Sequence, residues 1–306
     1  MVLDTLTLVA GVIILVVGSD RTVQAAATVA RDRGVSTFFV GVTLVAVGSS
    51  LPEIATAVYG AAYGQGSLVV GHVVGSATSQ ITLGVGVVAL LAPLSADSGK
   101  VTTYGVGMVL AMLAMLVAIS SGVVSRLEGV VMALAYLAFV ALRYEYTDYD
   151  DAVGSRLTDE NALTHPLLWG VVGLAFVLVG GHLLVTGARG VAAGFGASVY
   201  LLGLLTGLGT TTPEIAVAAL AVHRERGGIA VGTLFGSNIT DPLLSLGVGA
   251  AVAPIAVDNP ETTLLSVGYM LVVSAAVVAV FYQREEVGRW AAVGCLLLYL
   301  PALFLG

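Results

Sequence analysis

The sequence has few of the residues on which disulfide-stabilised, metal-thiolate or nucleic-acid-binding proteins depend. Only 10% of its 306 residues are charged, one is a cysteine, and one of the twelve basic residues is a lysine. The lone Cys295 excludes a disulfide framework and a metal site built from several cysteines. The formal net charge of −7 and the shortage of lysine argue against a nucleic-acid partner, because such proteins carry clustered basic residues.

Apolar residues dominate the chain instead. They make up 58% of it, and the mean hydropathy of +1.00 is far above that of soluble domains. A helix needs roughly 17–25 apolar residues to cross a bilayer. Apolar runs of at least the required length recur at residues 3–19, 36–63, 68–92, 102–120, 127–143, 166–187, 197–223, 228–253, 262–282 and 287–305. We therefore predict an all-α integral membrane protein with ten transmembrane helices.

The basic residues predict the orientation of these helices. The opening MVLDTL has no basic segment before its apolar run, so we expect a retained helix and not a cleaved signal peptide. With the N-terminus outside, ten of the twelve Lys and Arg residues fall in cytoplasmic loops, and only Arg126 and Arg189 fall outside. Because basic residues concentrate on the cytoplasmic side, we predict a multi-pass plasma-membrane protein with both termini extracellular.

Two halves of the sequence resemble each other at a constant offset of 161 positions. The segment GSSLPEIATA (48–57) matches GTTTPEIAVA (209–218), and GHVVGSATSQ (71–80) matches GTLFGSNITD (232–241). Five spans in each copy is an odd number, so the second copy crosses the membrane in the opposite sense. This inverted-topology repeat is typical of secondary transporters.

The repeat divides the chain into three predicted regions. These are a first repeat at residues 1–143, an acidic cytoplasmic linker at 144–165 and a second repeat at 166–306. The linker carries six acidic residues. We interpret it as a solvated connection and not as a cation sensor, because the spacing of a calcium loop is missing.

The motif GSSLPE predicts a broken helix at mid-depth in the membrane. Gly48 and Pro52 disfavour a continuous helix, while Ser49 and Ser50 can cap a following half-helix that carries Glu53 in its first turn. Carbonyls, hydroxyls and a carboxylate then meet where unpaired backbone is tolerated only inside protein or beside water. A bound cation would satisfy these oxygens.

Further polar side chains repeat every four residues and therefore share one helix face. They are His72, Ser76 and Gln80 in one copy and Thr233, Ser237 and Asp241 in the other. The glycines Gly71, Gly75, Gly232 and Gly236 predict close approach of neighbouring helices. The histidine is interpreted as a packing residue, with a role in proton transfer or gating as the alternative.

Carboxylates give the strongest indication of function. A midplane carboxylate costs at least ~2.5 kcal/mol on insertion scales, so Glu53, Glu214 and Asp241 are functional candidates. Oxygen ligands without a histidine pair or a thiolate favour hard cations such as Ca²⁺ and Na⁺ over zinc or copper.

The paired motifs resemble the α-repeats of the sodium/calcium exchanger family within the cation/Ca²⁺ antiporters. The resemblance covers the whole chain and implies alternating access, in which the first and sixth helices slide across the other eight. It implies that the two repeat glutamates bind Ca²⁺ and Na⁺ with hydroxyls and carbonyls of the same motifs. The ligands it implies are Glu53, Glu214, Asp241, Ser50, Ser76, Thr210, Thr211 and Ser237, and Ser49 and Gln80 complete our candidate set.

Three departures from the family pattern bear on ion preference. Gln80 stands where the family usually has asparagine or aspartate, and His72 where it usually has asparagine. The second motif is GTTTPE in place of the common GTSLPE. Because Gln80 is one methylene longer than asparagine, we expect it to affect the relative Na⁺ and Ca²⁺ affinities.

We interpret the chain as a Na⁺/Ca²⁺ antiporter. We expect no enzymatic activity and no cofactor, since Ca²⁺ and Na⁺ are the transported ions. The lipid bilayer surrounds the protein, and we expect neither a nucleic-acid partner nor an obligatory protein partner. The nearest alternative is a Ca²⁺/H⁺ exchanger in which the two glutamates carry protons. An ion channel is disfavoured by the predicted broken helices, and an intramembrane hydrolase using the two glutamates as a carboxylate pair lacks any protease motif.

Charge counting predicts the stoichiometry. Three ionised carboxylates carry about −3, so one Ca²⁺ leaves about −1 and about three Na⁺ leave none. We expect a proton on Asp241 in the Ca²⁺-loaded state, because Gln80 at the matching position indicates that a neutral group is tolerated there. Electrogenic exchange near three Na⁺ per Ca²⁺ follows.

Overall fold

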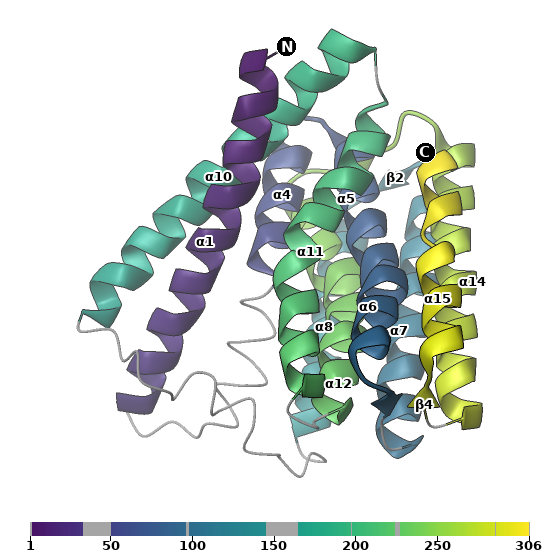
Figure 1. The fold of residues 1–306 in the computed structure, drawn as a ribbon. Helices are drawn as coiled ribbons and strands as arrows, with labels where there is room; N and C mark the ends of the chain where they lie inside the picture. Colours follow the sequence, from purple (N-terminus) through teal and green to yellow (C-terminus); the bar gives the residue numbers. More distant parts are fainter. Residues whose placement is uncertain are drawn as a thin grey trace.

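The computed structural model describes residues 2–32, 50–95, 98–144, 165–196, 198–223, 227–284 and 286–305. These residues are helical nearly throughout, with strands of only two residues (Figure 1). Among them, six helical segments are long and apolar enough to cross a membrane: Val2–Thr22, Gly66–Leu91, Val101–Ile119, Pro166–Phe195, Val199–His223 and Pro260–Arg284. The predicted helical, multi-pass membrane class is therefore confirmed.

The first half begins with the long helix α1 (Val2–Asp32). It continues with α4 (Leu51–Ala62), α5 (Gly66–Ser79), the π-helix η2 (Gln80–Gly84), α6 (Val85–Leu91), β1 (Leu94–Ser95), α7 (Ser98–Ile119), β2 (Val123–Val124) and α8 (Arg126–Tyr144). Most of the predicted acidic linker, residues 145–164, lies outside the described residues.

The second half has a similar order of elements. It comprises α10 (Pro166–Phe195), α11 (Val199–His223), α12 (Gly227–Thr240), the π-helix η3 (Asp241–Ser245), α13 (Leu246–Val252), β3 (Ile255–Ala256), α14 (Pro260–Arg284), β4 (Glu286–Val287), α15 (Arg289–Leu297) and the 3₁₀-helix η4 (Leu300–Phe304). Both chain ends lie at the same end of the molecule (Figure 1).

The offset of 161 positions extends from the sequence to the local structure. The elements α5, η2, α6 and β1 each begin and end 161 positions before α12, η3, α13 and β3. The strands pair between halves, because β1 is antiparallel to β4 and β2 is antiparallel to β3. Each half therefore contributes one strand to each pair.

A π-helical turn interrupts both inner helices directly after the polar stripe. The Val85 amide donates to the Gln80 carbonyl, and the Leu246 amide donates to the Asp241 carbonyl, in each case across five residues. Such turns occur as short bulges inside α-helices, frequently at functional sites. Gln80 and Asp241 are the first residues of these two turns and occupy matching positions in the two halves.

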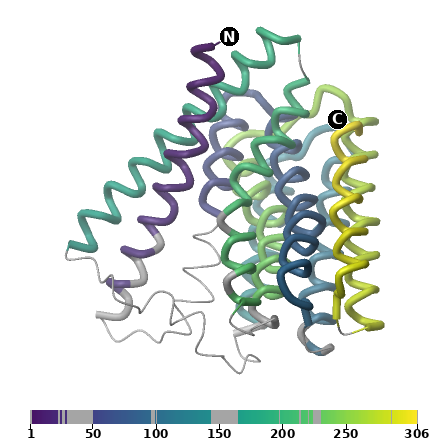
Figure 2. The backbone as a smooth tube through the Cα atoms, in the orientation of Figure 1, coloured from purple at the N-terminus to yellow at the C-terminus, as the bar shows by residue number. Residues whose placement is uncertain are grey.

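Two long helices, α1 and α10, lie side by side along one side of the molecule and are tilted relative to the others (Figures 1 and 2). We call them the helix pair, and the remaining helices the bundle. Glycines bring the two backbones of the pair together: a Cβ at Gly180 would lie 2.5 Å from the Leu15 nitrogen, and one at Gly18 would lie 2.7 Å from the Val177 nitrogen. The pair is therefore joined by backbone contact.

Hydrophobic side chains form a large core in the bundle and a smaller cluster where the helix pair meets it. The core contains Phe235, Phe281 and Met112, all fully buried. The smaller cluster joins Leu15 and Leu184 of the pair to bundle residues of α4, α5 and α11.

Two predicted helix boundaries need correction. The helices α1 and α10 continue past residues 19 and 187 to Asp32 and Phe195. The end of α10 is set by Gly196, whose φ of 61° is the left-handed conformation that commonly ends helices. In the first motif, α4 begins at Leu51 with Pro52 and Glu53 in its first turn, as predicted, but Ser50 before it makes no side-chain capping hydrogen bond. Gly48 and Ser49 lie outside the described residues.

The expectation of broken helices at the midplane is wrong for the second motif, because α11 is continuous through Pro213. Hydroxyl groups supply hydrogen bonds to carbonyls of the turn before the proline. Thr210 Oγ1 donates to the Gly207 carbonyl at 3.1 Å, and Thr211 Oγ1 donates to the same carbonyl at 2.8 Å. These hydroxyls do not replace the amide that Pro213 lacks, because the carbonyl four residues before the proline belongs to Gly209.

Candidate ion-binding site

The candidate site residues come from four helical segments, two in each half. The segment starting at α4 contributes Ser50 and Glu53, and α5 with η2 contributes Ser76 and Gln80. The second half contributes Thr210, Thr211 and Glu214 from α11, and Ser237 and Asp241 from α12 and η3. All nine are buried, with at most 6% of the side chain exposed. The tenth candidate, Ser49, lies outside the described residues.

Ser76 connects the two halves at the centre of the site. Its Oγ donates to Asp241 Oδ2 at 2.7 Å and lies 2.8 Å from Thr211 Oγ1. The same oxygen accepts from Gln80 Nε2 at 3.2 Å. The polar stripe of α5 therefore faces the proline motif of one helix and the acidic end of another.

The three carboxylates are buried near one another. Glu53 interacts electrostatically with both Asp241 and Glu214, and Glu214 interacts with Asp241. Several buried oxygens here have no hydrogen-bond partner among the described residues: both carboxylate oxygens of Glu53, Oε2 of Glu214, Oδ1 of Asp241, Ser50 Oγ and Asn238 Oδ1. Because burying an unpaired carboxylate oxygen is costly, this group of oxygens is suited to a cation.

Acidic side chains alone do not form the site. Among the described residues, no three His, Cys, Asp or Glu side chains are close enough to hold one metal ion together. Hydroxyl and carbonyl oxygens would have to supply the remaining ligands, as hard cations with high coordination numbers allow.

His72 bridges α5 and α11 beside these oxygens. Its Nδ1 lies 2.9 Å from Thr206 Oγ1, and its Nε2 lies 3.3 Å from Thr210 Oγ1. Both ring nitrogens therefore have hydroxyl partners, as expected for a buried packing histidine.

The close approach predicted from glycines is confirmed between α5 and α11. A Cβ at Gly71 would overlap the Tyr200 carbonyl, and one at Gly75 would overlap the Leu204 carbonyl. For Gly232 and Gly236, no atom of the described chain lies within 4 Å of the Cβ position. The tight interface therefore positions the polar stripe of α5 against α11.

Sequence reasoning missed Asn238 and Tyr136. Asn238 is fully buried, and its Nδ2 donates to Gln80 Oε1 at 2.7 Å. It follows Ser237 directly and falls off the four-residue stripe, although an asparagine in an apolar run was a usable signal. The hydroxyl of Tyr136 in α8 accepts from Thr240 Oγ1 at 3.3 Å, and its place in a long apolar helix gave no such signal.

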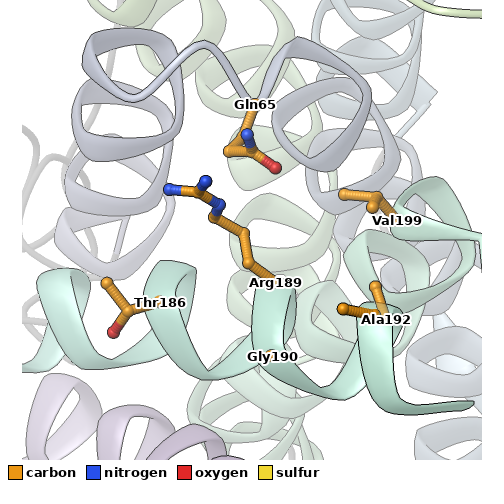
Figure 3. A pocket seen from close by; sticks show the side chains of 7 residues that line it. Gln65, Thr186, Arg189, Gly190, Ala192 and Val199 are labelled. Carbon is orange, nitrogen blue, oxygen red and sulfur yellow. The ribbon is translucent and has the colours of Figure 1, made fainter.

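A separate hollow of about 590 Å³ lies where α10 approaches the bundle. Its lining includes Gln65, Thr186, Arg189 and Val199, and none of the candidate ion ligands. The guanidinium of Arg189 points across it toward Gln65 (Figure 3).

Comparison with known proteins gives a consistent result. Residues 3–145 and 165–305 match the family described as sodium/calcium exchanger protein. The chain is 26% identical to the sodium/calcium exchanger MaX1 of Methanosarcina acetivorans, covering 97% of each protein. It is 30% identical to the uncharacterized membrane protein MJ0091 of Methanocaldococcus jannaschii, covering 96% of this chain and 94% of that protein.

A solved structure has the same fold over nearly the whole chain. It is that of the sodium-calcium exchanger NCX_Mj soaked with 2.5 mM Na⁺ and 0.1 mM Ca²⁺. The TM-score is 0.66 at 27% identity, and the alignment covers 99% of this chain and 98% of the other.

Proposed function

The chain belongs to the sodium/calcium exchanger family, and on this basis we propose that it exchanges Na⁺ for Ca²⁺ across the plasma membrane by alternating access. The observation that carries the proposal is the group of buried, unpartnered oxygens around Glu53, Glu214 and Asp241. A bound cation would compensate several of these oxygens at once.

We propose that ten spans form two inverted repeats, residues 1–143 and 166–306, joined by the linker 144–165. The matching bounds of the inner helices and the exchange of strands between halves support this arrangement. The position of both chain ends at one end of the molecule agrees with an even number of spans (Figure 1). The distribution of Lys and Arg favours extracellular termini.

The proposed ligands of Ca²⁺ are the carboxylates of Glu53 and Glu214, one from each half. The remaining candidates contribute hydroxyl or carbonyl oxygens: Ser49, Ser50, Ser76, Thr210, Thr211 and Ser237. Asp241 carries a proton in the Ca²⁺-loaded state and takes part in Na⁺ binding in the other. A proton on its unpartnered Oδ1 leaves the bond from Ser76 to Oδ2 in place.

Alternating access in this proposal is a sliding of the helix pair across the bundle. The pair has its own backbone contacts through glycines, and it meets the bundle through a small cluster of aliphatic side chains and through His182, whose Nδ1 lies 2.9 Å from the Tyr63 hydroxyl. Aliphatic contacts are non-directional, so they can be exchanged at low cost. The ion ligands all belong to the bundle.

A comparison of two gradients in proteoliposomes tests the proposal. An outward Na⁺ gradient should drive ⁴⁵Ca²⁺ uptake, and a pH gradient of equal size should not. Uptake driven by the pH gradient alone would establish the Ca²⁺/H⁺ exchanger instead, with His72 beside Thr210 as a residue to examine. Unitary currents through a single molecule would establish a channel, and cleavage of a peptide by the purified protein would establish a hydrolase.

A further inference from the structure

Two fully buried amides connect the halves of the chain next to the carboxylates. Asn238 of α12 donates from Nδ2 to Gln80 Oε1 of η2 at 2.7 Å. The residue that matches Asn238 in the first half is Ala77, 161 positions earlier. Alanine has no amide, so Ala77 cannot make the corresponding hydrogen bond to Asp241, and this link between the halves has no counterpart related by the repeat.

The partners of each amide fix its orientation. Asn238 Nδ2 lies 2.8 Å from the carbonyl of Leu234, which can only accept a hydrogen bond. The NH₂ group of Asn238 must therefore point this way, and its second hydrogen is directed at Gln80. The oxygen of the Gln80 amide must therefore accept this hydrogen bond. The NH₂ group of Gln80 then points in the opposite direction, away from Asn238.

The NH₂ group of Gln80 consequently faces the ion ligands. It lies 3.2 Å from Ser76 Oγ and 3.5 Å from Asp241 Oδ2. Hydrogen-bond donors and cations compete for the same oxygens. In the observed orientation, the NH₂ group of Gln80 donates to Asp241 Oδ2. In the opposite orientation, the amide oxygen of Gln80 would face the site and could act as a further ligand.

We propose that Asn238 is a positioning residue that sets the selectivity between Na⁺ and Ca²⁺ by holding the Gln80 amide in this orientation. This inference rests on the proposed cation exchange. Release of Gln80 lets its oxygen turn toward Asp241, which adds a neutral ligand where a monovalent ion would bind. Apparent affinity for Na⁺ then rises relative to that for Ca²⁺, which is held mainly by the two glutamates.

The sharpest variant is Asn238→Ser. Its hydroxyl can still donate to the Leu234 carbonyl four residues back, as serine does in helices, but is too short to reach Gln80. Asn238→Leu, which is close to isosteric, removes both bonds. In ⁴⁵Ca²⁺ flux measurements, both variants should raise the ratio of apparent Na⁺ to Ca²⁺ affinity by about fivefold, the change in an equilibrium constant that one buried hydrogen bond typically causes. The maximal transport rate should stay within about twofold of that of the unaltered protein.

Thr240→Val is the matched control, because it removes a buried hydrogen bond to Tyr136 from the same helix without touching Gln80. It should leave the affinity ratio unchanged. Combining Asn238→Ser with Gln80→Leu should give the ratio of Gln80→Leu alone, since the asparagine acts through the glutamine. Additive shifts, or a ratio in Asn238→Ser equal to that in Thr240→Val, would overturn the inference.

A binding measurement separates this inference from the proposed function. The rise in melting temperature with added Ca²⁺ or Na⁺ reports ion binding without transport. If the unaltered protein shows no Na⁺-driven flux, the proposed function fails, and the melting data still give the effect of Asn238→Ser on ion preference. If the protein exchanges normally and the variant binds both ions as before, only the role of Asn238 fails.

Discussion

The helix pair and the bundle are both apolar and helical, but they satisfy their polar groups differently. In α1 of the pair, the buried hydroxyls of Ser19 and Thr28 each donate to a carbonyl four residues earlier. In the bundle, both carboxylate oxygens of Glu53 and one oxygen each of Glu214 and Asp241 are buried without a partner among the described residues. A bound cation in the bundle would satisfy them, as the proposed function requires.

The two regions also differ in how much protein surrounds them. Of the most apolar stretch of each helix, 22% is buried in α1 and 33% in α10, against 39% in α7 and in α14, 50% in α11 and 83% in the span Gly66–Leu91. A helix that mostly faces lipid can shift with little repacking, because lipid and aliphatic side chains are alike. In the proposed mechanism the ion ligands lie in the more enclosed bundle, and the movement is that of the pair.

The largest effect should come from removing a charge in the bundle. Glu53→Gln or Glu214→Gln removes a carboxylate that only the ion compensates, so Ca²⁺ flux should be abolished while the protein still inserts in the membrane. The rise in melting temperature caused by Ca²⁺ should also disappear. Glu261→Gln is the control, because Glu261 also follows a proline in the first turn of a helix but is exposed. Transport retained in either site variant would contradict the assignment.

A methyl group in the helix pair should affect movement and stability but not the ion site. Gly180→Ala would place a Cβ 2.5 Å from the Leu15 nitrogen and force α1 and α10 apart. Overpacking of this kind costs about 1–3 kcal/mol of unfolding free energy, which a lower melting temperature would report. The maximal exchange rate should fall, while the rise in melting temperature on adding Ca²⁺ should persist.

Gly268→Ala in α14 is the matched control for that change, because no described atom lies within 4 Å of its Cβ position. It should leave both the stability and the rate close to those of the unaltered protein. Loss of Ca²⁺ binding in Gly180→Ala would contradict the separation of the two regions.

Neutralising the third carboxylate should have a smaller effect than neutralising either glutamate. In Asp241→Asn the side chain keeps an oxygen for the bond from Ser76, and it loses a charge that a proton already neutralises in the proposed Ca²⁺-loaded state. Substantial Ca²⁺ exchange should therefore remain.

Flux through the unaltered protein should generate a membrane current, as expected for about three Na⁺ per Ca²⁺. Complete loss of transport in Asp241→Asn, or flux without a current, would show the charge count to be wrong.

The sequence allows prediction of the bundle site better than of the geometry that supports it. Glu53, Glu214 and Asp241 stand out because a carboxylate in an apolar span is costly, and the offset of 161 positions anticipates the matching inner helices. The continuity of α11 could not be foreseen, because whether a proline breaks a membrane helix depends on the neighbouring helices that pack against it.

Long-range contacts explain the rest of what sequence reasoning missed. The orientation of the Gln80 amide depends on Asn238, which is 158 positions away, and on the carbonyl of Leu234. The extension of α10 could have been foreseen, since glycine at residue 196 is a common helix end. Local patterns thus identify the candidate ion ligands, while the direction in which a neutral side chain points is decided by its partners.

The smallest effect should come from Gln80→Asn, which exchanges one neutral amide for another in the bundle. The shorter side chain cannot keep both the bond from Asn238 and the approach to Asp241, which Gln80 makes at 2.7 Å and 3.5 Å. The 3.5 Å approach to Asp241 is the weaker of the two and is the one expected to be lost, so the ratio of apparent Na⁺ to Ca²⁺ affinity should change by about threefold without loss of transport. Gln65→Asn, at the edge of the hollow beside α10 and away from the ligands, is the control. Because the helix pair contributes none of the proposed ligands, this shift should be the same in a Gly180→Ala background. Unchanged affinities for both ions would make Gln80 a packing residue, and a shift that depends on Gly180 would mean that the pair also shapes the ion site.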